Sequence, residues 1–263
     1  MVRRNGVLIL LGLVLITALA YFQPQPLLVV YEDALFALAP SAERAYRYGD
    51  RHFSALTPEE YNIARAEYFF HKAEAIDATF PGVQHQLARI DFLHANFPEG
   101  IKRINREIET YGEKNPNAYY IRALILGYQG KYLEAAADYE TYFTIAPANW
   151  AVINDYSWVL LKAELPEAAL AAVEWGLREW PGNPWLLHNQ VIALYELERY
   201  EEALQVAEAA TTAVEIVSRE GWLIAYPGND PLLADEGIAT FKKAVYDNKE
   251  KVRSTLEAKN SDE

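Results

Sequence analysis

Residues 130–136 read GKYLEAA, and residues 198–204 read ERYEEAL. In each stretch a tyrosine, Tyr132 or Tyr200, stands three residues before an alanine, Ala135 or Ala203. The two alanines are 68 residues apart, which is two periods of 34. A period of roughly 20 to 50 residues is typical of arrays built from one repeated structural unit. These two stretches therefore indicate an internal repeat.

The period of 34 runs through most of the chain in three linked series. Small residues recur every 34 or 35 positions at Ala66, Gly100, Ala135, Ala169, Ala203 and Gly237. Four residues later stand mostly bulky side chains, namely Phe70, Ile104, Tyr139, Val173, Ala207 and Phe241. Twelve residues earlier stand mostly small ones, namely Ser54, Ala88, Ala123, Ser157, Val191 and Ala225. Residues four apart share one helix face, and small residues allow two helices to cross closely. The pattern predicts six helix pairs.

Residues 130–147 and 198–210 resemble the tetratricopeptide-repeat (TPR) family, and the resemblance extends over about residues 42–251. It implies an all-α fold, a right-handed superhelical array of antiparallel helix pairs. We expect about five repeats and a degenerate sixth capping unit, after one N-terminal hydrophobic helix. Pro227 interrupts the first helix of that sixth unit. Thr57, Pro58 and Glu60 provide an N-cap hydroxyl, a proline for the first turn and a glutamate, so they predict a helix start.

The first 22 residues have two interpretations. Arg3 and Arg4 precede an uncharged run of 16 residues, 7–22. As a transmembrane anchor, this run would form roughly 24 Å of helix, short of a hydrocarbon core of about 30 Å. As a signal peptide, it ends in the small residues Ala18 and Ala20, which suit cleavage after Ala20. Positive charge stays on the cytoplasmic side, so both interpretations predict extracytoplasmic repeats, either on a single-pass membrane protein or on a secreted or periplasmic one.

Four segments follow from these patterns. We predict an anchor or signal peptide over residues 1–22, a linker or amphipathic helix over 23–40, the repeat array over 41–251 and a polar tail over 252–263. The segment 27–39 is an apolar stretch broken by Glu32 and Asp33, and we expect it to pack against the start of the array.

Composition and motifs argue against several classes of function. The 37 acidic and 24 basic residues give a formal charge of −13, which repels nucleic acid. The chain has no cysteine, and it contains no motif for phosphate binding, for metal binding or for a catalytic nucleophile. Its five histidines are scattered, and we interpret them as surface or cap residues. We therefore predict no enzyme activity, no cofactor and no metal, and a protein or peptide as partner.

The family resemblance also indicates which side chains face inward. In a tetratricopeptide-repeat array the first helix of each pair lines the concave groove. The predicted partner-binding residues in these helices are aromatic, amide or charged: His85, Gln86, Arg89, Tyr120, Asn154, Asp155, Trp158, Trp185, His188, Asn189 and Tyr195. Aromatic and amide side chains suit peptide recognition, although tryptophans in repeat arrays also fill the packing between helices.

Four hypotheses follow. The leading one is a membrane-tethered scaffold that binds a partner protein in its groove. The second is a cleaved binding protein, and the third is an enzyme whose site combines dispersed groove residues such as His85, Asp155 and His188. The third requires those three groups to converge within hydrogen-bond reach. The fourth is a purely structural array that holds a multi-protein envelope complex together through its outer surface.

Overall fold

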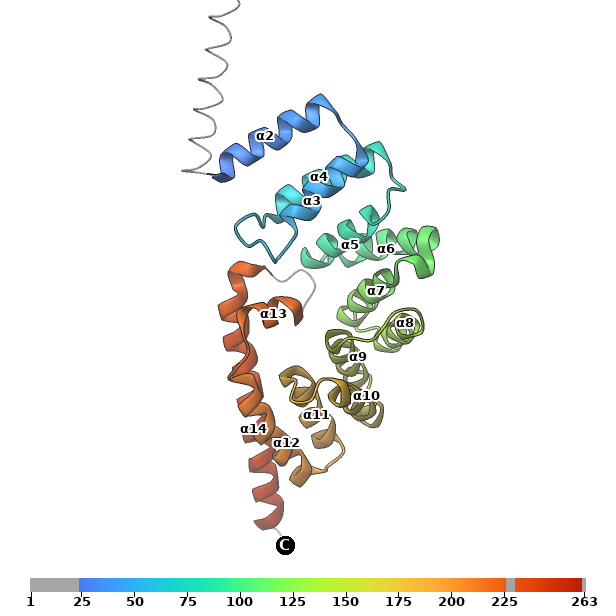
Figure 1. The fold of residues 1–263 in the computed structure, drawn as a ribbon. Coiled ribbons are helices and arrows are strands. Elements are labelled where there is room, and N and C mark those ends of the chain that lie inside the picture. The colour runs from blue at the N-terminus through green and yellow to red at the C-terminus, as the bar shows by residue number, and fades with distance from the viewer. Residues whose placement is uncertain (1–23, 226–229, 262–263) are drawn as a thin grey trace, which may run out of the picture. The chain divides into compact units, whose positions relative to one another are not determined.

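The protein is described by a computed structural model that covers residues 24–225 and 230–261. Within these ranges it is all-α, without a strand (Figure 1). The helices are α2 (Pro24–Leu38), α3 (Ala42–His52), α4 (Ile63–Ile76), α5 (Val83–Leu93), α6 (Phe97–Tyr111), α7 (Pro116–Tyr128), α8 (Tyr132–Ile145), α9 (Trp150–Lys162), α10 (Pro166–Glu179), α11 (Pro184–Glu196), α12 (Tyr200–Val214), α13 (Arg219–Ala225) and α14 (Ala234–Ser261). Short 3-10 turns occupy Gly112–Lys114 and Pro231–Leu233. The predicted all-α fold class is confirmed.

The chain divides into two compact units, which we call unit 1 (residues 1–83) and unit 2 (residues 84–263). In unit 1, α3 packs against α4, and α2 contacts α3. Glu32 of α2 is 1% exposed, and its Oε2 atom lies 2.7 Å from Nε2 of the buried His52. Nη1 of Arg51 is 3.3 Å from Oε1 of the same carboxylate. This buried ion pair attaches α2 to α3, and it corrects the interpretation of His52 as a surface or cap residue.

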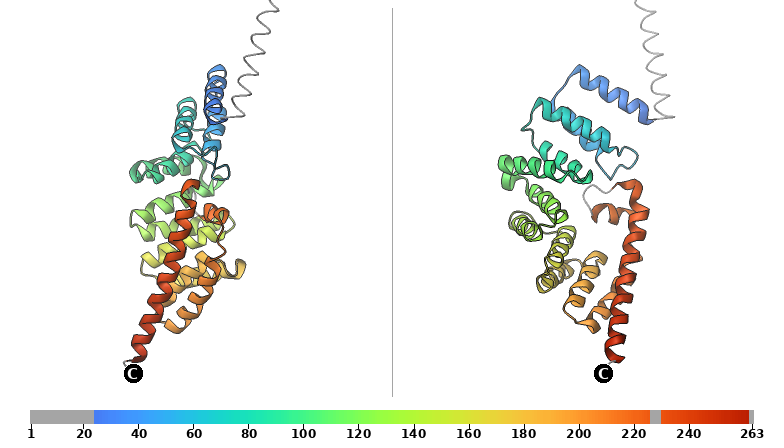
Figure 2. Two further views of the ribbon diagram at one scale, coloured as in Figure 1. Left: turned by 90° about the vertical axis from the view of Figure 1, so that its left-hand side faces the viewer. Right: turned by 180° about the vertical axis from the view of Figure 1, so that it is seen from behind.

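In unit 2 the helices pack in chain order. Each of α6 to α11 contacts the next helix, α14 packs along α12, and α13 packs against α14 (Figure 2). The predicted small residues lie where these helices cross: Ala135, Ala169 and Ala203 are fully buried. A Cβ atom on Gly237 would lie 2.1 Å from Cζ2 of Trp222, so α13 and α14 require glycine there.

One predicted helix start is wrong. Residues 57–60 form turns, and α4 begins at Ile63. Its N-cap is Asn62, whose side chain accepts a hydrogen bond of 3.0 Å from the backbone N–H of Arg65. Asparagine at this position satisfies an amide that has no partner inside the helix, so the helix starts there and not at Thr57.

The predicted membrane location also needs correction. Among the residues that the structure describes, no helix combines the length and the apolar content needed to cross a bilayer. This finding contradicts the single-pass location with extracytoplasmic repeats. The run 7–22, on which both the anchor and the signal-peptide interpretation rested, lies outside the described residues.

The C-terminal segment 252–263, predicted as a polar tail, is helical as far as Ser261, because α14 continues through it. The predicted boundaries of the four segments stay predictions.

Candidate functional site

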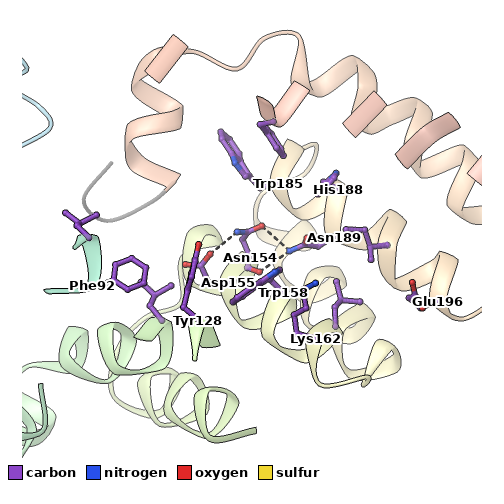
Figure 3. A pocket seen from close by; sticks show the side chains of 15 residues that line it. Phe92, Tyr128, Asn154, Asp155, Trp158, Lys162, Trp185, His188, Asn189 and Glu196 are labelled. Carbon is purple, nitrogen blue, oxygen red and sulfur yellow. Dashed lines mark hydrogen bonds between the residues drawn. The ribbon is translucent and has the colours of Figure 1, made fainter. Parts of the chain in front are cut away.

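Unit 2 contains a cavity of about 520 Å³. Its lining comes from the first helices of four consecutive pairs, α5, α7, α9 and α11, and from Phe241 of α14 (Figure 3). The lining residues include five aromatic side chains, Phe92, Tyr128, Trp158, Trp185 and Phe241. The cavity is therefore lined mainly by the helices that, according to the family resemblance, would face the groove.

A network of hydrogen bonds forms the polar floor of this cavity. The Tyr120 hydroxyl donates to Oδ2 of Asp155 over 2.7 Å, and Nδ2 of Asn154 donates to Oδ1 of Asp155 over 3.0 Å. Nδ2 of Asn189 lies 3.1 Å from Oδ1 of Asn154 and 2.8 Å from Oγ of Ser157. Tyr120 and Asp155, like Asn154 and Asn189, are 35 residues apart, one more than the period of 34 in this part of the chain. The floor thus connects α7, α9 and α11 through neighbouring positions of successive repeats.

Asp155 is the charged group of the floor, and it is 5% exposed. Burial disfavours the carboxylate and raises the pKa of Asp155 to about 7, against the opposing effect of the hydrogen bonds from Tyr120 and Asn154. The ion pairs found in residues 24–225 and 230–261 do not include Asp155. Its negative charge therefore has neutral donors around it but no cation.

One wall of the cavity is a cluster of aromatic rings beside Asp155. The ring centroids of Tyr128 and Trp158 are 5.5 Å apart, and those of Phe92 and Tyr128 are 5.1 Å apart. Tyr128 is 58% exposed, so one side of this wall faces solvent. The pKa of Tyr128 is raised by burial and by the nearby charge of Asp155. Figure 3 shows Tyr128, Asp155 and Trp158 as neighbours in one group.

Trp185 and Phe241 form a second wall, and Trp150 extends their stack beyond the cavity lining. Trp185 stacks on Trp150 with centroids 4.8 Å apart and on Phe241 with centroids 5.1 Å apart. The Phe241 ring also meets the His188 ring edge-on at 5.6 Å. Burial lowers the pKa of His188 to about 4, so this histidine is neutral at pH 7. Nε1 of Trp185 and Nδ1 of His188 are buried, and neither has a hydrogen-bond partner among the described residues.

The rim carries three residues that the sequence reasoning missed. Tyr128, Lys162 and Glu196 all line the cavity, and all three are exposed. They stand 34 residues apart, at the C-terminal ends of α7, α9 and α11. Lys162 lies one helical turn after the predicted groove residue Trp158, on the same helix face. Tyr128 and Glu196 occupy the same position one period earlier and one period later, so the pattern could have identified all three. Phe241 belongs to the series of bulky residues in the repeat pattern, but it lies in the second helix of its unit. The predicted groove residues all come from first helices, so Phe241 is not among them.

Six of the eleven predicted groove residues line the cavity, all of them from α9 and α11. They are Asn154, Asp155, Trp158, Trp185, His188 and Asn189. Tyr120 lies under the floor, where it is 8% exposed and donates to Asp155. Tyr195 lines a smaller cavity of about 110 Å³ instead. There Nζ of Lys251 in α14 lies 4.0 Å from the centroid of its ring.

The three predicted residues of α5 lie outside the cavity lining. Nη1 of Arg89 donates to Oε1 of Gln86 over 2.7 Å. Burial, together with the charge of Arg89, lowers the pKa of His85 to about 3. The enzymatic hypothesis needed His85, Asp155 and His188 to converge, and the cavity brings only the last two into one site. In the part of the chain that the structure describes, no cluster of three or more His, Asp or Glu side chains could hold a metal ion.

Solved structures of other proteins share this architecture. YrrB, a TPR protein with an unusual peptide-binding site, aligns with a TM-score of 0.51 and 17% identity, over 73% of this chain and 97% of YrrB. A tetratricopeptide repeat protein from Parabacteroides merdae aligns with a TM-score of 0.58 and 11% identity, over 84% of this chain and 90% of that one. The chain has the tetratricopeptide-repeat fold.

The pilF protein of Pseudomonas aeruginosa gives a further tetratricopeptide-repeat comparison, with a TM-score of 0.56 and 15% identity over 81% of this chain and 97% of that one. No protein-family model matches the chain, and no curated protein sequence matches it either. At these low identities the likeness shows the fold alone, so the function has to be argued from the cavity of unit 2.

Proposed function

We propose that the chain is a binding protein and that the cavity of unit 2 holds a segment of a partner protein. The observation that supports this most is the lining itself, in which four first helices and α14 surround about 520 Å³ with five aromatic side chains over a polar floor. Ligand sites of roughly 300–1,000 Å³ typically combine apolar walls with a few placed polar groups. A volume of this size accommodates a few side chains of a peptide.

Exposure of the aromatic side chains supports a partner at this surface. Tyr128 is 58% exposed and Trp158 is partly exposed, although large aromatic side chains of this kind usually favour burial. Tyrosine and tryptophan contribute large contact areas at low cost in side-chain entropy, and they are enriched among the residues that dominate binding energy. YrrB, which shares the fold, is itself a TPR protein with a peptide-binding site.

Site-specific photocrosslinking tests the proposal. A photoreactive phenylalanine derivative replaces Trp158 in one variant and Leu133 in another. Leu133 is the control because it is 67% exposed on α8 and does not line the cavity. We expect a defined protein adduct from position 158 and none from position 133. Adducts from position 133 alone would contradict binding in the cavity and would support an array that contacts partners through its outer surface.

A further inference from the structure

We infer that the partner segment inserts a cationic side chain, lysine or arginine, into the cavity between the aromatic walls, with Asp155 as its counter-charge. This inference rests on the proposed function and adds the chemistry of the ligand. Three features of the described residues support it: a buried carboxylate without a cation, ring faces beside that carboxylate, and the balance of charge around the cavity.

The carboxylate of Asp155 retains capacity to accept further hydrogen bonds. Each of its two oxygens receives one hydrogen bond, from Tyr120 and from Asn154. An ionised carboxylate offers about four acceptor sites, so about two remain. A buried charge is costly unless it is paired. A ligand cation would supply the pairing that the described part of the chain does not.

The rings beside Asp155 suit a cation as well. A lysine or arginine head group within about 6 Å of a ring centroid is attracted to the ring face, most strongly to tryptophan. Tyr128 and Trp158 lie near Asp155 (Figure 3), and Trp185 stacks on Phe241 in the second wall. The apolar stem of a long basic side chain also packs well against such walls.

Charge around the cavity favours the same sign of ligand. At the rim, the exposed Lys162 and Glu196 contribute one charge of each sign, so Asp155 determines the sign at the floor. His188 also lines the cavity, and its lowered pKa leaves it neutral at pH 7. Arg89 of α5 lies outside the lining, but its charge acts on the Tyr120 hydroxyl that donates to Asp155. The formal charge of −13 on the whole chain further attracts basic partners.

A matched peptide series tests the inference on the full chain. The probes are acetyl-Ala-Ala-X-Ala-Ala-amide with arginine, citrulline, lysine or acetyl-lysine at X, so each charged probe has a neutral analogue of similar shape. Binding is followed by the NMR signals of the Trp158 and Trp185 indole N–H groups. We expect the arginine or lysine probe to shift these signals and to bind about tenfold more tightly than its neutral analogue.

Two test variants and one control locate the effect. Asp155→Asn should abolish the preference for charge, whereas Glu174→Gln, on the exposed face of α10, should retain it. Tyr128→Leu serves as a second test because this side chain is largely exposed, so its removal leaves the packed core intact. We expect this variant to weaken the charged probes by about fivefold.

The outcomes separate this inference from the proposed function. Equal binding of charged and neutral probes at the two indoles would overturn the cationic ligand and leave the cavity as a peptide site. Failure of every probe to bind would also overturn the inference, while photocrosslinking at position 158 would still decide whether the cavity binds a partner. Stronger binding of the charged probes that survives Asp155→Asn would place the cation site elsewhere on the chain.

Discussion

Glu32 in unit 1 and Asp155 in unit 2 are both buried carboxylates, but their surroundings differ. Glu32 has basic side chains around it: Nε2 of His52 lies 2.7 Å from its Oε2, and Nη1 of Arg51 lies 3.3 Å from its Oε1. Asp155 has, among the described residues, the neutral donors Tyr120 and Asn154, at 2.7 and 3.0 Å. The comparison contrasts a carboxylate that joins two helices through basic partners with one whose described partners are neutral.

The pKa values follow the same division. Burial alone would lower the pKa of His52, but the hydrogen bond and charge of Glu32, with a backbone contact from Glu60, raise it. The raised pKa favours the protonated form of His52 beside Glu32. Burial also raises the pKa of Asp155, to about 7, and the hydrogen bonds from Tyr120 and Asn154 offset this rise only in part. A buried carboxylate of this kind weakens the fold near neutral pH.

The largest expected effect comes from Glu32→Ala, which leaves His52 buried without its partner. Removing one member of a buried ion pair costs about 3–5 kcal/mol. All six tryptophans lie in unit 2, so fluorescence does not report on unit 1. Hydrogen exchange of the amides in α2, α3 and α4 should instead become much faster.

The matched control is Asp33→Ala, one residue further along α2. Asp33 is 46% exposed and pairs with Nη2 of Arg65 at 2.7 Å. An exposed pair contributes about 0–1 kcal/mol, so exchange should change little. If both variants behaved alike, the buried pair would have no special role in attaching α2.

The next largest effect is a change in the free energy of unfolding caused by Asp155→Asn, and this change depends on pH. Asp155 binds protons more tightly in the folded protein than in the unfolded chain. The free energy of unfolding therefore falls as pH rises from about 4 to about 7. Asparagine does not titrate, so the variant should gain stability relative to the parent across this window, on the order of a few kcal/mol.

Urea denaturation followed by tryptophan fluorescence at pH 4.5, 6 and 7.5 measures this difference. The lowered pKa values of His85 and His188 act in the opposite direction, since their stabilisation is lost as pH falls below 6.5. Both histidines are present in parent and variant, so their contributions cancel. A difference in stability that stays constant with pH would mean that Asp155 titrates normally.

Tyr120→Phe should have a smaller effect that also depends on pH. It removes one donor from Asp155, which costs about 1–3 kcal/mol when the acceptor is charged. The loss should be larger at pH 8, where Asp155 is ionised, than at pH 5. Tyr156→Phe is the control, because its hydroxyl donates to the exposed Glu140 over 3.0 Å. The same urea titration compares the two variants.

The smallest effect is expected for Lys162→Gln. This side chain is exposed at the rim, so stability should change by less than about 0.5 kcal/mol. Removal of its positive charge should slightly strengthen binding of the arginine probe. Weaker binding of that probe would instead indicate that Lys162 contacts the peptide and that the cavity prefers an acidic ligand.

The repeat period predicted the parts of the fold that depend on neighbours in sequence. In a repeat array each unit packs on the next, so a small residue such as Ala135 or Ala203 marks a helix crossing without knowledge of distant contacts. The polar floor uses neighbouring positions of the period, since Asn189 stands one period of 34 after Asp155 and not after Asn154. The sequence named both asparagines as groove residues, but their hydrogen bonds are visible only in three dimensions.

What the sequence could not predict depends on contacts outside the period. Glu32 and His52 belong to no repeated position, so their pairing is visible only in three dimensions. The helix start at Thr57 matched a local motif, but Asn62 provides the cap that the fold uses. Phe241 reaches the cavity because α14 packs along α12 and contacts α11.

The pKa of Asp155 tests the central claim most directly. It can be measured by NMR from the carboxyl carbon signal as a function of pH, with and without saturating arginine or citrulline probe. We predict a pKa near 7 in the free protein, a clear decrease with the arginine probe and little change with the citrulline probe. A normal pKa in the free protein, or the same value with both probes, would contradict the account of Asp155 as an uncompensated charge that binds a cationic ligand.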